Sequence, residues 1–150
     1  MEYQFDKLNA WCFGPIENPI GYLVYTHLLV EHAINYIIFK KCKNSNKLKK
    51  MSFATKADIL YEMELLPEWI YYNICKMNKF RNRLVHDLEV NYENIDLELK
   101  TLSGYSVPLN DLLADKSKDR LISIINIIGQ HVIIPLNTMI AVEYLSKEKK

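Results

Sequence analysis

The sequence has few of the residues that cross-link or interrupt a chain: three cysteines, four glycines and five prolines among 150 residues. Cys12, Cys42 and Cys75 are an odd number without a Cys-x-x-Cys spacing, which excludes a disulfide framework and a zinc site built on paired cysteines. The first residues, MEYQFDKLNAW, lack the basic start and apolar run of a signal peptide. We therefore expect a reduced, cytoplasmic protein without metal or another cofactor.

The chain also lacks an excess of charge of either sign, with 19 Lys and Arg against 18 Asp and Glu. This balance excludes a polybasic tail and an acidic, disordered chain, so a nucleic acid would have to meet a local basic patch. Length and a hydrophobic content of 49% are those of one globular domain, and no repeat or linker divides the sequence. We expect a single domain over residues 1–150.

Long hydrophobic runs are absent except for residues 121–142, LISIINIIGQHVIIPLNTMIAV. This run is long enough to cross a bilayer. However, Asn126, Gly129, Gln130 and Pro135 distribute polar or helix-weakening groups through it, and no second apolar run could shelter them. A membrane-associated protein is therefore the last of the alternatives. We expect a buried core helix kinked at Pro135, and no membrane partner.

Helical spacing of the apolar residues predicts three helices in the first part of the chain, over residues 19–41, 53–64 and 67–86. Ser52 is a suitable N-cap for the second helix, and Pro67 suits the first turn of the third. The first two are joined by a polar, basic connector, KKCKNSNKLKK.

Apolar and polar residues alternate over residues 95–100, and Ser103 and Gly104 offer a turn before a second short extended segment. This pattern predicts a small β-hairpin. The fold class that we predict is all-α, a bundle of four to five helices with a short β-hairpin-like insertion.

Arg81 lies in the middle of an apolar stripe. A helical wheel at about 100° per residue places Ile74, Met77 and Leu84 within about 60° of it. Asn82 and His86 lie along one edge of the same helix with the i, i+4 spacing of side chains that can touch. An arginine at such a position needs a partner.

Glu31 has the complementary position, in the middle of the apolar stripe of the first helix. Because burying either charge alone costs several kcal/mol, we expect an ion pair between Glu31 and Arg81 across the packed helices. One interpretation is that this pair only fixes the register of the helices.

The functional interpretation is that Arg81, Asn82 and His86 supply what RNA cleavage without a metal requires. Arg81 is a fixed cation for the phosphate, and His86 is an imidazole that can move the proton of a 2′-hydroxyl. Lys76, Lys79 and Arg83 add positive potential for binding RNA.

The hexapeptide Arg81-Asn82-Arg83-Leu84-Val85-His86 resembles the signature of the HEPN superfamily, an Arg separated from a His by four to six residues and often followed by a polar residue. The arrangement of Ser52, Lys56, Leu65-Leu66-Pro67, Ile74 and Asn78 is similar to the mannitol-repressor-like branch. The resemblance implies a helical bundle that dimerises so that two motifs face one cleft. It also implies a metal-independent endoribonuclease, commonly a toxin of a toxin–antitoxin pair or a phage-defence effector.

By this resemblance, Arg81 and His86 form the catalytic pair, Asn82 supports them, and RNA, a second copy and an antitoxin or regulatory protein are the expected partners. The alternative is a non-catalytic, mannitol-repressor-like regulatory or protein-interaction bundle, because some members of that branch act through binding.

The remaining histidines, cysteines and tyrosines predict no further catalytic centre. His27 and His32 are five residues apart, which is wrong for two metal ligands on one helical face, so we predict no metal site. His131 is expected to be buried and hydrogen-bonded, and Cys75 to be a buried, inert thiol. Tyrosines such as those at 71–72 either stack on unpaired bases or serve packing.

Overall fold

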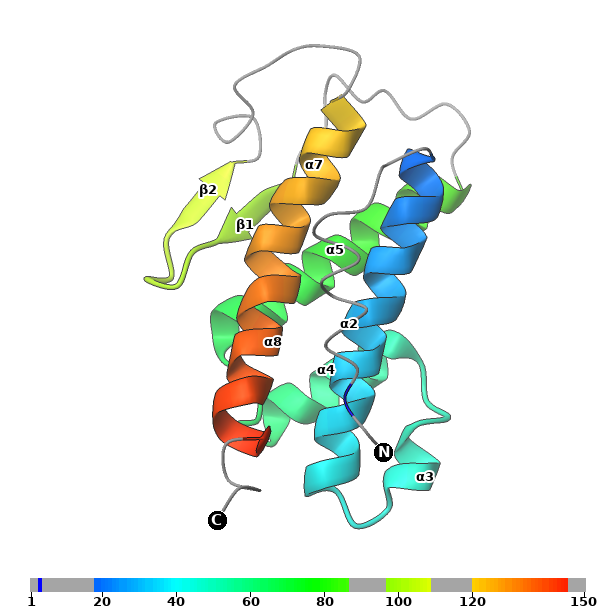
Figure 1. Ribbon diagram of the computed structural model, residues 1–150, viewed down its shortest axis with the longest axis vertical. Helices are drawn as coiled ribbons and strands as arrows, with labels where there is room; N and C mark the ends of the chain where they lie inside the picture. The colour runs from blue at the N-terminus through cyan, green and yellow to red at the C-terminus, as the bar shows by residue number, and fades with distance from the viewer. Residues whose placement is uncertain (1–2, 4–17, 87–96, 109–119, 146–150) are drawn as a thin grey trace.

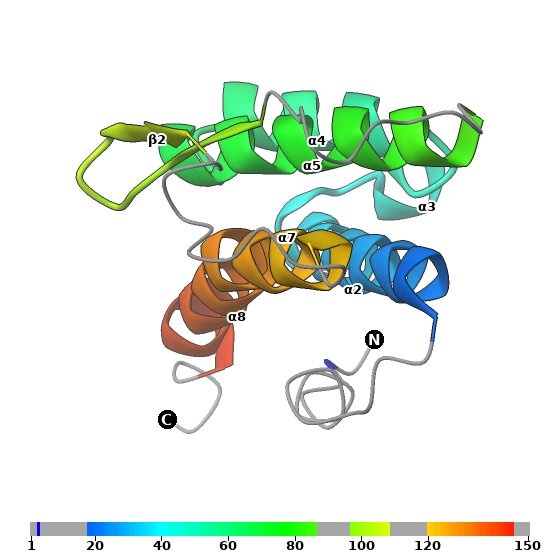
Figure 2. The same cartoon turned by 90° about the horizontal axis from the view of Figure 1, so that it is seen from above.

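Two layers of helices make up the described part of the chain. The computed structural model describes residue 3 and residues 18–86, 97–108 and 120–145 (Figure 1). Helices α4 (Phe53–Glu62) and α5 (Glu68–His86) lie over α2 (Pro19–Lys41) and the C-terminal helix, as Figure 2 shows from above. The short α3 (Ser45–Leu48) lies in the connector between α2 and α4. The C-terminal helix has four successive segments: α7 (Arg120–Ile128), η2 (Gly129–Ile133), α8 (Ile134–Ile140) and η3 (Ala141–Leu145).

The predicted starts of the first two helices are confirmed by their caps, whereas α5 begins at Glu68, one residue after the expected start at Pro67. The Asn18 side chain accepts a hydrogen bond from the backbone N–H of Gly21 at 3.1 Å, so α2 begins at Pro19. Ser52 Oγ accepts one from the N–H of Thr55 at 3.2 Å and caps α4. Helix α4 ends at Glu62, two residues before the expected end at Glu64, which has a positive φ of 56°.

The predicted β-hairpin is also present. Strands β1 (Glu98–Lys100) and β2 (Ser106–Pro108) pair antiparallel, with Leu99 opposite Val107. Gly104 supplies a φ of 80° in the turn between them, a conformation that glycine adopts without steric cost. Leu97 and Leu99 are buried, and the residues that alternate with them are more exposed. The alternation therefore positions the hairpin against α5 and gives it one apolar face.

Helix α2 is the centre of the core, because it contacts α4, α5, α7 and α8. Its buried face is mainly aliphatic, and the facing helices contribute side chains of the same kind. Each such buried side chain stabilises the fold by about 1.5–3 kcal/mol relative to an exposed one. The largest fully buried aliphatic side chains of the two layers include Leu23, Ile34, Ile37, Leu60, Ile74, Met77 and Ile124.

Pro135 is accommodated inside the C-terminal helix. A proline has no N–H to donate to the carbonyl four residues before it, which here belongs to His131. The helix passes through the π-helical segment η2 at this point, and the side-chain amide of Asn73 donates to the His131 carbonyl at 3.0 Å. The same amide donates to the carbonyl of Lys100 at 2.9 Å and its oxygen accepts from the Lys100 N–H at 2.7 Å. Asn73 therefore joins α5 to both β1 and the C-terminal helix.

Within the described residues, one helix, Leu121–Tyr144, is long and apolar enough to cross a membrane, with a mean hydropathy of 1.5. Half of this stretch is buried against the rest of the molecule, and the core helix of a soluble protein has the same properties. Its contacts with α2 and α5 are those expected of the predicted core helix.

Tyr3 packs on the core. Its ring stacks on His32 with centroids 5.3 Å apart, lies 5.0 Å from the ring of Tyr36, and its hydroxyl bonds to the Asn137 side chain. Residues 4–17 and 109–119 lie outside the described residues.

Candidate active site at the end of helix α5

Arg81 and Asn82 interact directly near the C-terminal end of α5. Arg81 Nη1 donates a hydrogen bond to Asn82 Oδ1 at 2.8 Å, so the amide holds one side of the guanidinium. Arg81 is half-buried, and its Nε is buried without a hydrogen-bond acceptor in the described part of the chain. A buried donor without a partner carries a desolvation cost of about 1–3 kcal/mol, more for a charged group.

His86 is exposed, four residues beyond Asn82. Helical geometry places Arg81 and His86 about 140° apart around the axis, whereas Asn82 and His86 are only about 40° apart. The bond to Asn82 therefore draws the Arg81 guanidinium toward the edge of α5 that carries His86. The structure thus brings Asn82 to Arg81 and aligns it with His86, while Arg81 and His86 form no direct contact.

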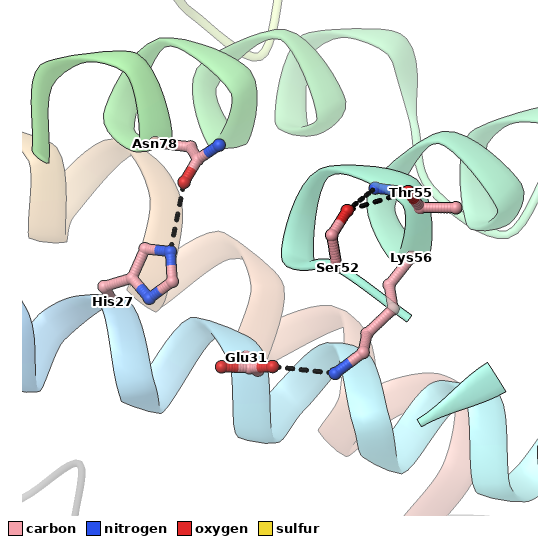
Figure 3. A network of polar contacts seen from close by, with 6 residues as sticks. All are labelled: His27, Glu31, Ser52, Thr55, Lys56 and Asn78. Atoms are coloured by element: carbon pink, nitrogen blue, oxygen red, sulfur yellow. Dashed lines mark hydrogen bonds and ion pairs between the residues drawn. The ribbon is translucent and has the colours of Figure 1, made fainter. Parts of the chain in front are cut away.

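The predicted ion pair between Glu31 and Arg81 is wrong. Figure 3 shows Glu31 bound instead to Lys56 of α4, whose Nζ lies 2.7 Å from Glu31 Oε1. The Lys56 side chain is only 3% exposed, and that of Glu31 is 29% exposed. Glu31 therefore holds Lys56 and does not support Arg81.

The pairing of His27 with Asn78 explains this difference. His27 of α2 lies 3.2 Å, through Nε2, from Asn78 Oδ1 of α5 (Figure 3). Helices α2 and α5 run in roughly opposite directions (Figure 1), so Glu31, one turn after His27, and Arg81, almost one turn after Asn78, diverge from this contact. The register of the two helices therefore separates the two charges.

His27 is a buried imidazole that contacts the same helix as the motif. An amide oxygen can only accept, so His27 Nε2 carries the proton in this bond. Its ring packs on Phe53 with centroids 4.1 Å apart. Burial is the main cause that lowers the pKa of His27 below its ordinary value, and the charge of Arg81 lowers the pKa further. The bond to Asn78 and the charge of Glu31 raise the pKa, but they do not outweigh burial. His27 is therefore neutral at pH 7 and lies in the electrostatic field of Arg81.

The three predicted substrate-binding cations lie on the solvent side of α5. Lys79 and Arg83 are exposed, and Lys76 is half-buried with its Nζ 5.1 Å from the centroid of the Tyr72 ring. None of the three makes an ion pair within the part of the chain that the structure describes. The basic connector lies at the other end of the bundle, around α3, so it does not extend this group (Figure 1).

The other candidate residues have structural environments. His131 is half-exposed, not fully buried as expected, and its Nδ1 donates to the Ile127 carbonyl at 2.9 Å. Cys75 is half-buried, and burial raises the pKa of its thiol. Among the described residues, no group of three or more His, Cys, Asp and Glu side chains is arranged to hold a metal ion.

An apolar cavity of about 440 Å³ lies elsewhere, between the start of α5, the hairpin and α8. It is lined by Trp69, Leu102, Ile134 and Pro135 among others, and by none of the motif residues. It is therefore not part of the candidate site.

Sequence reasoning missed the correct partner of Glu31, although a signal was present. Lys56 lies three residues after Phe53 and four before Leu60, in the apolar stripe of α4. The helical wheel that singled out Glu31 and Arg81 would have singled out Lys56 as a third charge of the same kind. Nothing in the sequence indicates that Asn78 faces His27.

Comparisons with models of protein families, with curated proteins and with solved structures find no match to this chain. The resemblance of residues 81–86 to the HEPN signature therefore stays a prediction.

Proposed function

We propose that the protein is a metal-independent endoribonuclease of the HEPN type, acting as a toxin or defence effector, with Arg81, Asn82 and His86 as its catalytic group. The observation that carries the proposal is the bond from Arg81 Nη1 to Asn82 Oδ1 at 2.8 Å, on the edge of α5 where His86 is exposed. This bond holds the Arg81 guanidinium at the same exposed end of α5 as the His86 imidazole.

In the proposed reaction, His86 accepts the proton of a ribose 2′-hydroxyl, and the 2′-oxygen attacks the neighbouring phosphorus. The bond from phosphorus to the 5′-oxygen breaks, leaving a 2′,3′-cyclic phosphate on one product. The 5′-oxygen takes up a proton and becomes the 5′-hydroxyl of the other product. Arg81 stabilises the charge on the non-bridging phosphate oxygens during this step, and Asn82 orients Arg81.

We further propose a homodimer in which two such helix ends face one cleft. The backbone positions of Arg81 and His86 are about 140° apart around the axis of α5, and within one copy the two side chains form no direct contact even though Asn82 draws the guanidinium toward His86. In a symmetric dimer, one imidazole can take the 2′-hydroxyl proton while His86 of the partner subunit protonates the leaving oxygen.

The test is to incubate the purified protein with mixed RNA in excess chelator and to follow fragmentation on a gel. We expect cleavage by wild type, none by His86→Ala and strongly reduced cleavage by Arg81→Ala. Cleavage by His86→Ala at the wild-type rate would overturn the mechanism.

Expression in cells distinguishes the enzyme from a binding module of the mannitol-repressor type. A toxic ribonuclease should impair growth, and His86→Ala should relieve the impairment. Equal growth with both forms, together with no cleavage in the gel assay, would favour the binding module.

A further inference from the structure

The side of α5 that faces away from the other layer carries a continuous row of basic and aromatic side chains. Figure 2 shows α5 in the outer layer, with one side turned away from α2 and the C-terminal helix. Members of the row recur every three or four residues, which places them within about 40° of one line along the helix. We call this row the outer ridge; it consists of Tyr72, Lys76, Lys79, Arg83 and His86.

The outer ridge is positively charged at its C-terminal end, whereas carboxylates compensate the positive charge near its N-terminal end. Lys76, Lys79 and Arg83 have no ion-pair partner in the described chain, so no carboxylate there compensates their three charges along the ridge. At the other end, Lys100 Nζ is 2.7 Å from Glu68 Oε1, which compensates its charge. The Tyr72 hydroxyl donates to Glu98 at 3.4 Å. The positive potential therefore extends from Lys76 to His86.

Tyr72 lies where this potential ends. The ammonium groups of Lys76 and Lys100 are 5.1 and 4.8 Å from the centroid of its half-exposed ring. Aromatic rings beside lysine side chains are typical of surfaces that bind single-stranded nucleic acid, where bases stack on the rings and phosphates contact the lysines. A base that stacks on Tyr72 displaces an ammonium group, which can then reach the adjacent phosphate.

We propose that the outer ridge binds extended, single-stranded RNA, with phosphates along Lys76, Lys79 and Arg83 and an unpaired base stacked on Tyr72. The proposal rests on the proposed function in one respect: the bound strand runs to His86, where it is cut. Tyr72 and His86 are fourteen positions apart, which at a rise of about 1.5 Å per residue holds the strand over about 21 Å on one side of the scissile bond. Duplex RNA does not fit this site, because its bases are already stacked.

Binding is measured by fluorescence anisotropy with a 5′-fluorescein oligouridylate about twelve nucleotides long, in the His86→Ala background so that the probe is not cut. The logarithm of the affinity is plotted against the logarithm of the salt concentration. For a single strand, each phosphate contact contributes about 0.7 to the magnitude of the negative slope. In Lys76→Gln/Lys79→Gln the slope should fall by about 1.4. The control Lys43→Gln/Lys47→Gln removes the same charge from exposed lysines at the far end of the bundle and should leave the slope unchanged.

The tyrosine is tested with a matched pair of variants. Tyr72→Leu should weaken binding about tenfold, within the range for one base stacked on an aromatic ring, whereas Tyr72→Phe should bind like the parent. A blunt duplex of the same length should bind equally to both.

Equal slopes for the two lysine double variants, parent-like binding of the oligouridylate by Tyr72→Leu, or no binding at all would overturn the proposal. Cleavage by wild type with any of these results would leave the proposed function standing. Conversely, binding along the outer ridge without cleavage by wild type would support the ridge and overturn the catalytic mechanism.

Discussion

Glu31→Gln is expected to lower the free energy of unfolding by about 2–3 kcal/mol. The change leaves the Lys56 ammonium, in a side chain only 3% exposed, without its counter-charge. Breaking a buried ion pair by removing one partner costs about 3–5 kcal/mol. We expect a somewhat smaller loss because Glu31 is 29% exposed and glutamine keeps an oxygen that can accept from Lys56 Nζ. For a chain of this length the loss corresponds to a fall in Tm of about 4–12 °C.

The assay is urea denaturation followed by circular dichroism, with two matched controls. Glu68→Gln breaks the pair of Lys100 and Glu68, which has the same distance of 2.7 Å but a Glu68 side chain 68% exposed, and should leave the free energy of unfolding unchanged. Glu31→Gln/Lys56→Met removes both charges and should recover most of the stability. A Glu31→Gln variant that unfolds like Glu68→Gln would refute the reasoning.

Three further predictions concern other positions. His86→Ala should keep the wild-type Tm, because this imidazole is exposed; a large fall would show that His86 supports the fold. Asn73→Ala should lower the free energy of unfolding in urea by about 2–4 kcal/mol, because the His131 carbonyl loses its donor. Adding Pro135→Ala should recover part of this loss, because alanine restores a backbone N–H. An equal loss with and without Pro135→Ala would contradict the role of Asn73. Burial is the main cause that lowers the pKa of His27, so the unfolded chain binds the proton more readily than the folded chain. The free energy of unfolding should therefore fall as the pH drops below about 6.5. His27→Gln should reduce this fall, and a variant with the same pH profile as wild type would contradict the prediction.

Much of the fold could be predicted because its signals are local. Ser52 caps α4 through a hydrogen bond to a residue three positions away, and Gly104 permits the turn of the hairpin. The alternation around Leu97 and Leu99 shows which face of β1 is buried. Such signals act within a few residues, so the sequence displays them directly.

The candidate site was predicted less completely because its contacts join different helices. A wheel shows that Arg81 and Glu31 each lie in an apolar stripe, but the register of α2 against α5 decides which charges meet. That register places Asn78 beside His27 and leaves Glu31 to Lys56. The bond between Arg81 and Asn82 joins neighbouring residues, and the catalytic role of Asn82 stays a prediction.

The most direct test of the central claim is the mass of the products that wild-type protein releases from a short RNA in excess chelator. Attack by the 2′-hydroxyl predicts a 2′,3′-cyclic phosphate on one fragment and a 5′-hydroxyl on the other, with an all-deoxy oligonucleotide left intact. Fragments with a 3′-hydroxyl and a 5′-phosphate, or cleavage of the all-deoxy strand, would contradict the roles assigned to Arg81 and His86.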